Sequence, residues 1–327
     1  MLTSLLLLLG GLATIVKGGD LFVAAALRLA GFLRLPRVVI GSTLVSLATT
    51  MPELVVSITA GLRGESGLAV GNAVGSVICN LALILGVTAC LKPVEIHLAS
   101  LRLPLATLLA AGLLLVLLTG DLRLERWQGG LLLTLGVGYF SGDFIRHWRS
   151  RKPEEVSEAK AIREGITGTR FAWLETQSGS LVQFFVGAAV VVLGSRLIVD
   201  GAVDVAARLG VPSIVVGLTV VALGTSLPEL VTAITSARNS VSDLAVGNVL
   251  GANIANLTLI VGSAALILPV ELDRPTQVFS FPVMLGLIGT VLGMLWLAHG
   301  LTRRNGLTLL AIYAGYLATL ALLSLRR

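Results

Sequence analysis

Residues 46–59 read SLATTMPELVVSIT, and residues 222–235 read ALGTSLPELVTAIT. Each stretch is followed by a second one, AVGNAVGSVICN at residues 69–80 and AVGNVLGANIAN at residues 245–256. The two copies align without a gap at one offset, 176 residues (229 minus 53), and pair Glu53 with Glu229. A carboxylate at membrane depth usually marks an ion or proton pathway. Two of them on broken helices in matching halves predict a transporter binding site where the repeats meet.

The composition is that of a polytopic membrane protein. Of 327 residues, 55% are hydrophobic and 13% are charged, whereas a soluble domain carries about 25% charged residues. The net charge of +6 arises from basic residues near helix ends, which favours membrane anchoring over nucleic-acid binding. Cys79 and Cys90 lie in one apolar stretch without CxxC or metal spacing, so we expect reduced packing residues.

The apolar segments predict an all-α fold of ten transmembrane helices. Their expected ranges are 2–29, 37–62, 67–91, 98–118, 123–147, 180–208, 212–238, 242–268, 276–298 and 305–325. The first lacks a basic n-region and a cleavage site, which indicates a spanning helix and not a signal peptide. Five helices before the linker and five after it predict two inverted-topology repeats, at 1–147 and 180–327, joined by the linker at 148–179.

The distribution of lysine and arginine predicts the orientation in the membrane. The side that holds the linker would carry 15 of the 24 basic residues and the opposite side seven. By the positive-inside rule the linker is cytoplasmic and both termini face outward, in a multi-pass protein of the cell (inner) membrane. The lipid bilayer is then the expected partner, and the sequence indicates no nucleic acid and no obligate protein partner.

The proline of each copy predicts where backbone oxygens become available. Proline lacks an N–H, which frees carbonyls near Thr49 in the first copy and near Thr225 in the second. Such carbonyls are tolerated at membrane depth only against protein or a water-filled cavity. Helical spacing places further oxygens on the same faces as the acids. These oxygens belong to Thr49 and Thr50 on the face of Glu53, and to Thr225 and Ser226 on the face of Glu229. On the next helix Ser76 and Asn80 share one face, and Asn256 is the counterpart of Asn80.

Oxygen donors of this kind suit hard cations and not zinc or copper. His97, His147 and His299 lie near helix ends, away from the acids. Ca²⁺ accepts six to eight oxygens in flexible geometry, whereas Mg²⁺ requires an octahedron, so Ca²⁺ fits better. Single prolines, hydroxyls or asparagines have ordinary structural explanations as kinks and helix contacts. Two acids at membrane depth, one in each copy and neither with a cationic partner in the sequence pattern, have no such structural explanation.

These motifs resemble the cation/calcium antiporter superfamily, specifically its prokaryotic sodium/calcium exchanger branch. Its two repeats carry G-T-S-x-P-E and G-N-x-x-G-S-x-x-x-N, which read here ATTMPE with GNAVGSVICN, and GTSLPE with GNVLGANIAN. The resemblance implies that Glu53 and Glu229 bind Ca²⁺, with Thr49 and Thr225 beside them. The other implied cation ligands are Thr50, Ser226, Ser76, Asn80 and Asn256, with the backbone carbonyls of Ser46 and Ala222.

The chain departs from the family pattern at three positions, and a fourth position, which matches it, differs from K⁺-dependent relatives. Ala48 and Thr50 replace the usual Gly and Ser, and Ala252 replaces a Ser, so one hydroxyl is missing from the second half. Asn256 stands where K⁺-dependent relatives carry Asp, which argues against K⁺ transport.

The resemblance implies a secondary antiporter that exchanges Na⁺ for Ca²⁺ by alternating access. The ions are substrates, and neither a cofactor nor an enzyme activity is expected. Because two facing carboxylates repel each other, a loaded carrier should move and an empty one should stall. A proton-coupled Ca²⁺ antiporter that uses the same glutamates is the main alternative. An intramembrane hydrolase is a less suitable interpretation, because the sequence contains neither an HExxH motif nor a nucleophile–base pair. A channel is also less suitable, because broken helices repeated in two halves are typical of alternating access.

Overall fold

The computed structural model describes residues 2–33, 35, 37–62, 66–95, 98–149, 172–208, 222–272, 274, 276–298 and 300–325. Over these ranges the chain is almost entirely helical, with four two-residue strands. Seven of the described helices are long and apolar enough to cross a membrane, and Arg37–Thr49 is a shorter apolar helix. These properties are those of an all-helical membrane protein.

Short connections separate the consecutive elements of the first half. They are α1 (Leu2–Leu33), α2 (Arg37–Ile40), η1 (Gly41–Val45), α3 (Ser46–Thr49), α4 (Met51–Leu62), α5 (Ser66–Cys79), η2 (Asn80–Ile84), α6 (Leu85–Leu91), β1 (Val94–Glu95), α7 (Leu98–Leu118), β2 (Arg123–Leu124) and α8 (Arg126–Arg149). The segments η1 and η2 are π-helical turns within longer helices.

The second half repeats this order. Its elements are η3 (Ala172–Glu175), α10 (Gln177–Arg208), α12 (Ala222–Thr225), α13 (Leu227–Arg238), α14 (Ser242–Ala255), η5 (Asn256–Ile260), α15 (Val261–Ile267), β3 (Val270–Glu271), η6 (Thr276–Ser280), α16 (Phe281–Ala298), β4 (Gly300–Leu301) and α17 (Arg303–Leu325). The bounds of α14, η5 and α15 equal those of α5, η2 and α6 shifted by 176 residues.

Each of the ten predicted ranges contains helix in its described part, although the range 123–147 begins with strand β2 and its helix starts at Arg126. Three of the ten predicted ranges have no counterpart among the seven long apolar helices of the described chain. The predicted range 37–62 is interrupted at Thr50, α8 carries more polar residues, and the start of range 212–238 lies outside the described residues. A plan of ten membrane crossings therefore stays a prediction.

The two halves interlock through matching contacts. Strand β1 pairs with β4 and β2 pairs with β3, so the first strand of each half meets the second strand of the other. Likewise α6 packs on α17 as α15 packs on α8. This exchange of partners is what a two-fold relation between the halves produces.

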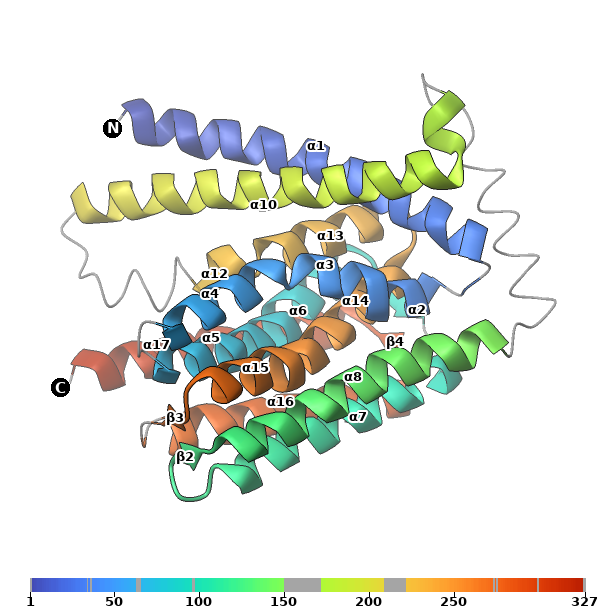
Figure 1. Ribbon diagram of the computed structural model, residues 1–327. Helices are drawn as coiled ribbons and strands as arrows, with labels where there is room; N and C mark the ends of the chain where they lie inside the picture. Colours follow the sequence, from blue (N-terminus) through green and yellow to red (C-terminus); the bar gives the residue numbers. More distant parts are fainter. Residues whose placement is uncertain are drawn as a thin grey trace.

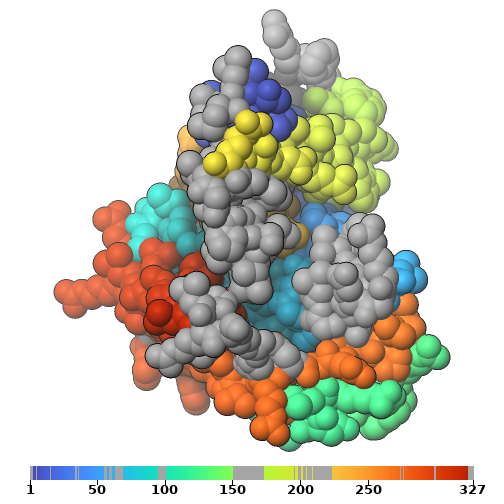
Figure 2. All heavy atoms as spheres, turned by 90° about the vertical axis from the view of Figure 1, so that its left-hand side faces the viewer, coloured from blue at the N-terminus to red at the C-terminus, as the bar shows by residue number. Residues whose placement is uncertain are grey.

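Helices α1 and α10 form a separate layer. They lie side by side and run in opposite directions (Figure 1). Figure 2 shows their blue and yellow spheres at one edge and those of α7 and α8, in green, at the opposite edge. The short broken helices lie between these layers (Figure 1). Burial follows this order, since 78% of the apolar window of α14–α15 is buried but only 29% of that of α1.

Polar contacts fasten α1 to α10 near both ends. Ser4 donates a hydrogen bond to Asp204 at one end. At the other end Arg28 donates to Gln183 at 2.5 Å and to Ser180 at 3.3 Å. Arg28 is only 2% exposed and lies between the two helices. The paired helices are therefore built as one unit.

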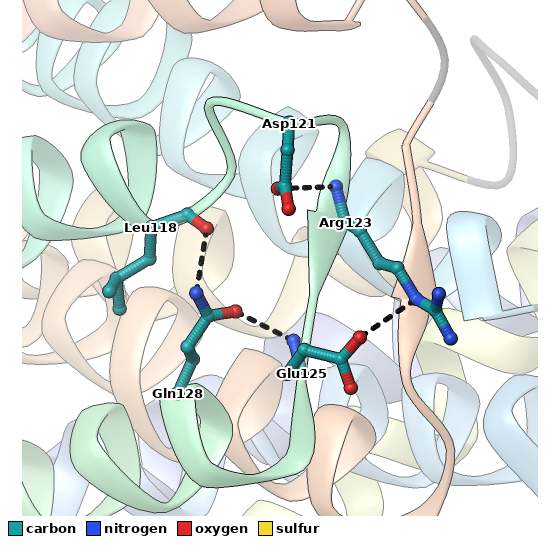
Figure 3. Close-up of polar contacts among 5 residues, drawn as sticks. All are labelled: Leu118, Asp121, Arg123, Glu125 and Gln128. Atoms are coloured by element: carbon teal, nitrogen blue, oxygen red, sulfur yellow. Dashed lines mark hydrogen bonds and ion pairs between the residues drawn. The ribbon is translucent and has the colours of Figure 1, made fainter.

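A hydrogen-bonded turn joins α7 to α8 (Figure 3). Gln128 donates to the Leu118 carbonyl at 3.1 Å and accepts from the Glu125 amide at 2.7 Å. Asp121 accepts from the Arg123 amide at 3.2 Å, and the Arg123 guanidinium pairs with Glu125 at 3.0 Å. These bonds fix the α7–α8 hairpin at this end.

Candidate functional site

Each of the two matching helices is broken just before its glutamate. Thr50 leaves the helical conformation (φ −82°, ψ 3°), and Ser226 does so in the same way (φ −89°, ψ 6°). Pro52 and Pro228 follow two residues later and cannot continue the backbone bonding of α3 and α12. Glu53 and Glu229 are thus the third residues of α4 and α13, in the first turn of a new helix. The positive end of the helix dipole favours negative charge there.

The two carboxylates are buried together. Both glutamates are 0% exposed, and they lie close enough to repel each other. Glu53 Oε1 accepts a hydrogen bond from Ser226 Oγ at 3.3 Å. Glu53 Oε2 and both carboxylate oxygens of Glu229 have no hydrogen-bond partner within the described chain, although the Thr49 hydroxyl lies beside Glu229. Such orphaned acceptors are the atoms that a cation would bind.

Ser226 joins the two halves at this point. Its hydroxyl also lies 3.3 Å from Ser76 Oγ on α5. The residue is 1% exposed, as is Ser76. The two hydroxyls, predicted from separate repeats, are therefore adjacent to one another, and that of Ser226 also lies next to Glu53.

Asn80 and Asn256 each begin a π-helical segment, which locally widens the helix. Asn80 donates to Asn253 Oδ1 at 3.0 Å, and its own Oδ1 has no partner. Neither side-chain polar atom of Asn256 has a hydrogen-bond partner among the described residues. Both asparagines are 0% exposed, so these amide oxygens are additional buried acceptors.

The two threonines next to the helix breaks bond across the repeats. Thr49 donates to Asn248 Oδ1 at 3.2 Å, and Thr225 donates to Asn72 Oδ1 at 3.5 Å. Asn72 and Asn248 stand 176 residues apart in the GN pairs of the two copies. They are absent from the predicted site, although the duplicated GN pair is a signal that would have found them. Asn253 is also absent, and its counterpart is Val77, so the duplication gives no signal for it.

The carbonyl of Ser46 is occupied in this structure. It accepts the Thr50 amide at 3.0 Å, the Thr50 hydroxyl at 2.7 Å and the Thr49 hydroxyl at 3.3 Å. The Thr50 hydroxyl thus bonds back to its own helix. Ala222 begins α12, directly after residues that the structure does not describe.

The chemistry of the assembled donors is that of a hard-cation site. The described residues contain no group of three or more His, Cys, Asp or Glu side chains that could hold a metal ion. The site instead combines two carboxylates with amide and hydroxyl oxygens from both repeats. Ca²⁺ and Na⁺ accept such ligands, whereas zinc and copper favour nitrogen and sulfur.

Comparison with known proteins defines the class of the chain. The family model described as "Sodium/calcium exchanger protein" matches residues 3–140 and 179–322. The chain therefore belongs to the sodium/calcium exchanger family, in agreement with the resemblance of its motifs.

Individual relatives cover nearly the whole chain. The inner membrane protein YrbG of Escherichia coli is 34% identical over 99% of this chain and 97% of its own length. The sodium/calcium exchanger MaX1 of Methanosarcina acetivorans is 31% identical over 96% and 97%. A solved structure of the sodium-calcium exchanger NCX_Mj, soaked with Na⁺ and without Ca²⁺, matches with a TM-score of 0.82 at 28% identity, over 98% of this chain and 99% of that one.

Proposed function

We propose that this protein exchanges Na⁺ for Ca²⁺ across the membrane by alternating access, with Glu53 and Glu229 as the central cation ligands. The observation that carries the proposal is the pair of fully buried, mutually repelling carboxylates with three oxygens lacking hydrogen-bond partners in the described chain. Family membership and the exchanger relatives support the same activity.

The remaining ligands divide between the repeats. We assign Thr49, Thr50, Ser76, Asn80 and the Ser46 carbonyl to the first half, and Thr225, Ser226, Asn256 and the Ala222 carbonyl to the second. For the Ser46 carbonyl to bind a cation, the hydroxyls of Thr49 and Thr50 have to turn away from it. Those hydroxyls would then be free to bind the cation too.

Charge balance accounts for obligatory exchange. Without a cation, two facing carboxylates in a buried site repel each other and lack solvation. One Ca²⁺ cancels both charges, and Na⁺ ions do the same. The loaded site therefore crosses between its inward-open and outward-open states, and the empty site stalls.

The moving part we propose is the α1–α10 layer. Hydrogen bonds join its two helices to each other near both ends, and the layer is less buried than the broken helices beneath it. Its antiparallel course and the exchanged strand pairs support two inverted repeats, at 1–147 and 180–327 (Figure 1). With the linker 148–179 in the cytoplasm and both termini outside, the layer would slide to open one side and then the other.

The direct test is Ca²⁺ uptake into proteoliposomes loaded with Na⁺. We expect uptake with Na⁺ inside and none with choline inside, and Glu53→Gln should abolish it. Uptake that follows an imposed proton gradient equally well, without Na⁺, would favour the proton-coupled alternative. Uptake in choline-loaded vesicles at the same rate would contradict exchange altogether.

A further inference from the structure

A residue of the second half holds the Asn80 side chain in one orientation. Asn80 Nδ2 donates to Asn253 Oδ1 at 3.0 Å, and both residues are 0% exposed. Because the oxygen and nitrogen of an amide are fixed relative to each other, this bond also sets the direction of Asn80 Oδ1. That oxygen has no hydrogen-bond partner among the described residues, so it is available to bind a cation.

Asn80 lies beside the carboxylates of the proposed site. It follows Ser76 by four residues, on the same helix face. Ser76 Oγ lies 3.3 Å from Ser226 Oγ, which donates to Glu53. If both amides were reversed, one hydrogen bond would still join them, but the Asn80 N–H groups would point where Oδ1 points now. A cation attracts the amide oxygen and repels the N–H groups, so the observed orientation is the one that binds it.

The matching asparagine of the second half has no such support. Asn256 is 0% exposed, and neither of its side-chain polar atoms has a hydrogen-bond partner within the described chain. The offset of 176 residues (256 minus 80) that relates Asn80 to Asn256 also relates Val77 to Asn253. Segment α5 packs on η5 as α14 packs on η2, which places Val77 on the helix that meets Asn256. Valine has no hydrogen-bonding atom in its side chain, so it cannot orient the Asn256 amide.

We propose that Asn253 is a positioning residue, which holds Asn80 with its side-chain oxygen toward the cation, and that Val77 leaves Asn256 without the equivalent support. The inference rests on the cation site proposed above and adds to it a residue that does not itself bind the ion. Ala252, which stands where the first half has Ser76, removes a hydroxyl from the same side of the site. The two halves are therefore unequal, and the ligands around Asn80 are the better ordered.

The test is a double-mutant cycle, read by Ca²⁺ titration of the purified full-length protein in Na⁺-free buffer. Asn253→Val introduces the residue found at the matching position 77, and it should weaken Ca²⁺ binding about tenfold, the range of one buried hydrogen bond. In an Asn80→Ala background the same change should have no further effect on Ca²⁺ affinity, because the side chain that Asn253 positions is absent.

A bond between two buried amides that only joins helices would give a different result. In that case Asn253→Val would lower the Tm measured without Ca²⁺ and keep the wild-type Ca²⁺ affinity, which would overturn the proposal. Equal weakening with and without the Asn80 side chain would overturn it as well. Ile254→Val, a truncation at the next buried residue of α14, is the matched control and should lower only the Tm. Wild-type protein that binds no Ca²⁺ would refute the cation site itself.

The converse change tests the proposal even where Asn253→Val does not fold. Val77→Asn supplies Asn256 with an acceptor, and it should strengthen Ca²⁺ binding about threefold. The gain should vanish in Asn256→Ala, because the amide to be oriented is then absent. No gain from Val77→Asn, or a gain of the same size in the Asn256→Ala background, would contradict the inferred difference between the two halves.

Discussion

Replacing Glu229 with glutamine should remove most of the stabilisation that Ca²⁺ gives to the folded protein. Glutamine keeps the shape of the side chain and removes its charge. Neither Glu229 oxygen bonds to the described protein, so no other contact compensates for the lost attraction to the cation. Removing one partner of a buried charge pair costs about 3 kcal/mol or more, which is about a hundredfold or more in affinity.

The assay is the thermal stability of the purified protein in Na⁺-free buffer with and without Ca²⁺. At a Ca²⁺ concentration of 100 times the wild-type Kd, binding stabilises the wild type by about 2.7 kcal/mol. If the Kd of Glu229→Gln is a hundredfold higher, the same concentration stabilises it by only about 0.4 kcal/mol. Glu271→Gln, exposed on β3, is the matched control and should behave as the wild type. A Ca²⁺-dependent stabilisation of Glu229→Gln equal to that of the wild type would refute the site assignment.

Three further predictions concern the same site. Ala252→Ser restores the missing hydroxyl at a fully buried position and should strengthen the Na⁺ activation of Ca²⁺ efflux, while Ser76→Ala should weaken it; unchanged Na⁺ dependence in both variants would exclude Na⁺ from this position. Asn248→Ala and Asn72→Ala each remove the acceptor of a cross-repeat threonine bond and should lower Ca²⁺ affinity about tenfold in binding titrations, unless the threonine hydroxyls do not contribute. Protons compete with Ca²⁺ for the two carboxylates, so the apparent Ca²⁺ affinity should fall as pH falls through the acidic range, and a flat profile would contradict this.

The duplicated motifs predicted the helix ranges because duplication and apolar length are properties of the sequence itself. The match between α5–α6 and α14–α15, element by element, follows from the same 176-residue offset. The breaks at Thr50 and Ser226 were predictable from the prolines two residues later. Among the described residues, seven helices are long and apolar enough to cross a membrane, and the ten-helix plan remains a prediction.

The contacts across the repeats were not predictable in the same way. The bonds from Thr49 to Asn248 and from Asn80 to Asn253 join residues 199 and 173 positions apart, and they depend on how the halves pack. Helical spacing places side chains on a face but does not say which face meets which. The burial of Arg28 was not predictable for the same reason, since its partners Ser180 and Gln183 belong to the other half.

The most direct test of the central claim is Ca²⁺ efflux from Ca²⁺-loaded proteoliposomes into media that differ only in the external cation. If a cation must neutralise Glu53 and Glu229 before the carrier can return, external Na⁺ or external Ca²⁺ should each support efflux. An external medium with only an impermeant cation should support none, and a drop in external pH should not replace Na⁺. Equal efflux into all media would indicate a channel, and efflux driven by external acid alone, as fast as with Na⁺, would contradict sodium exchange.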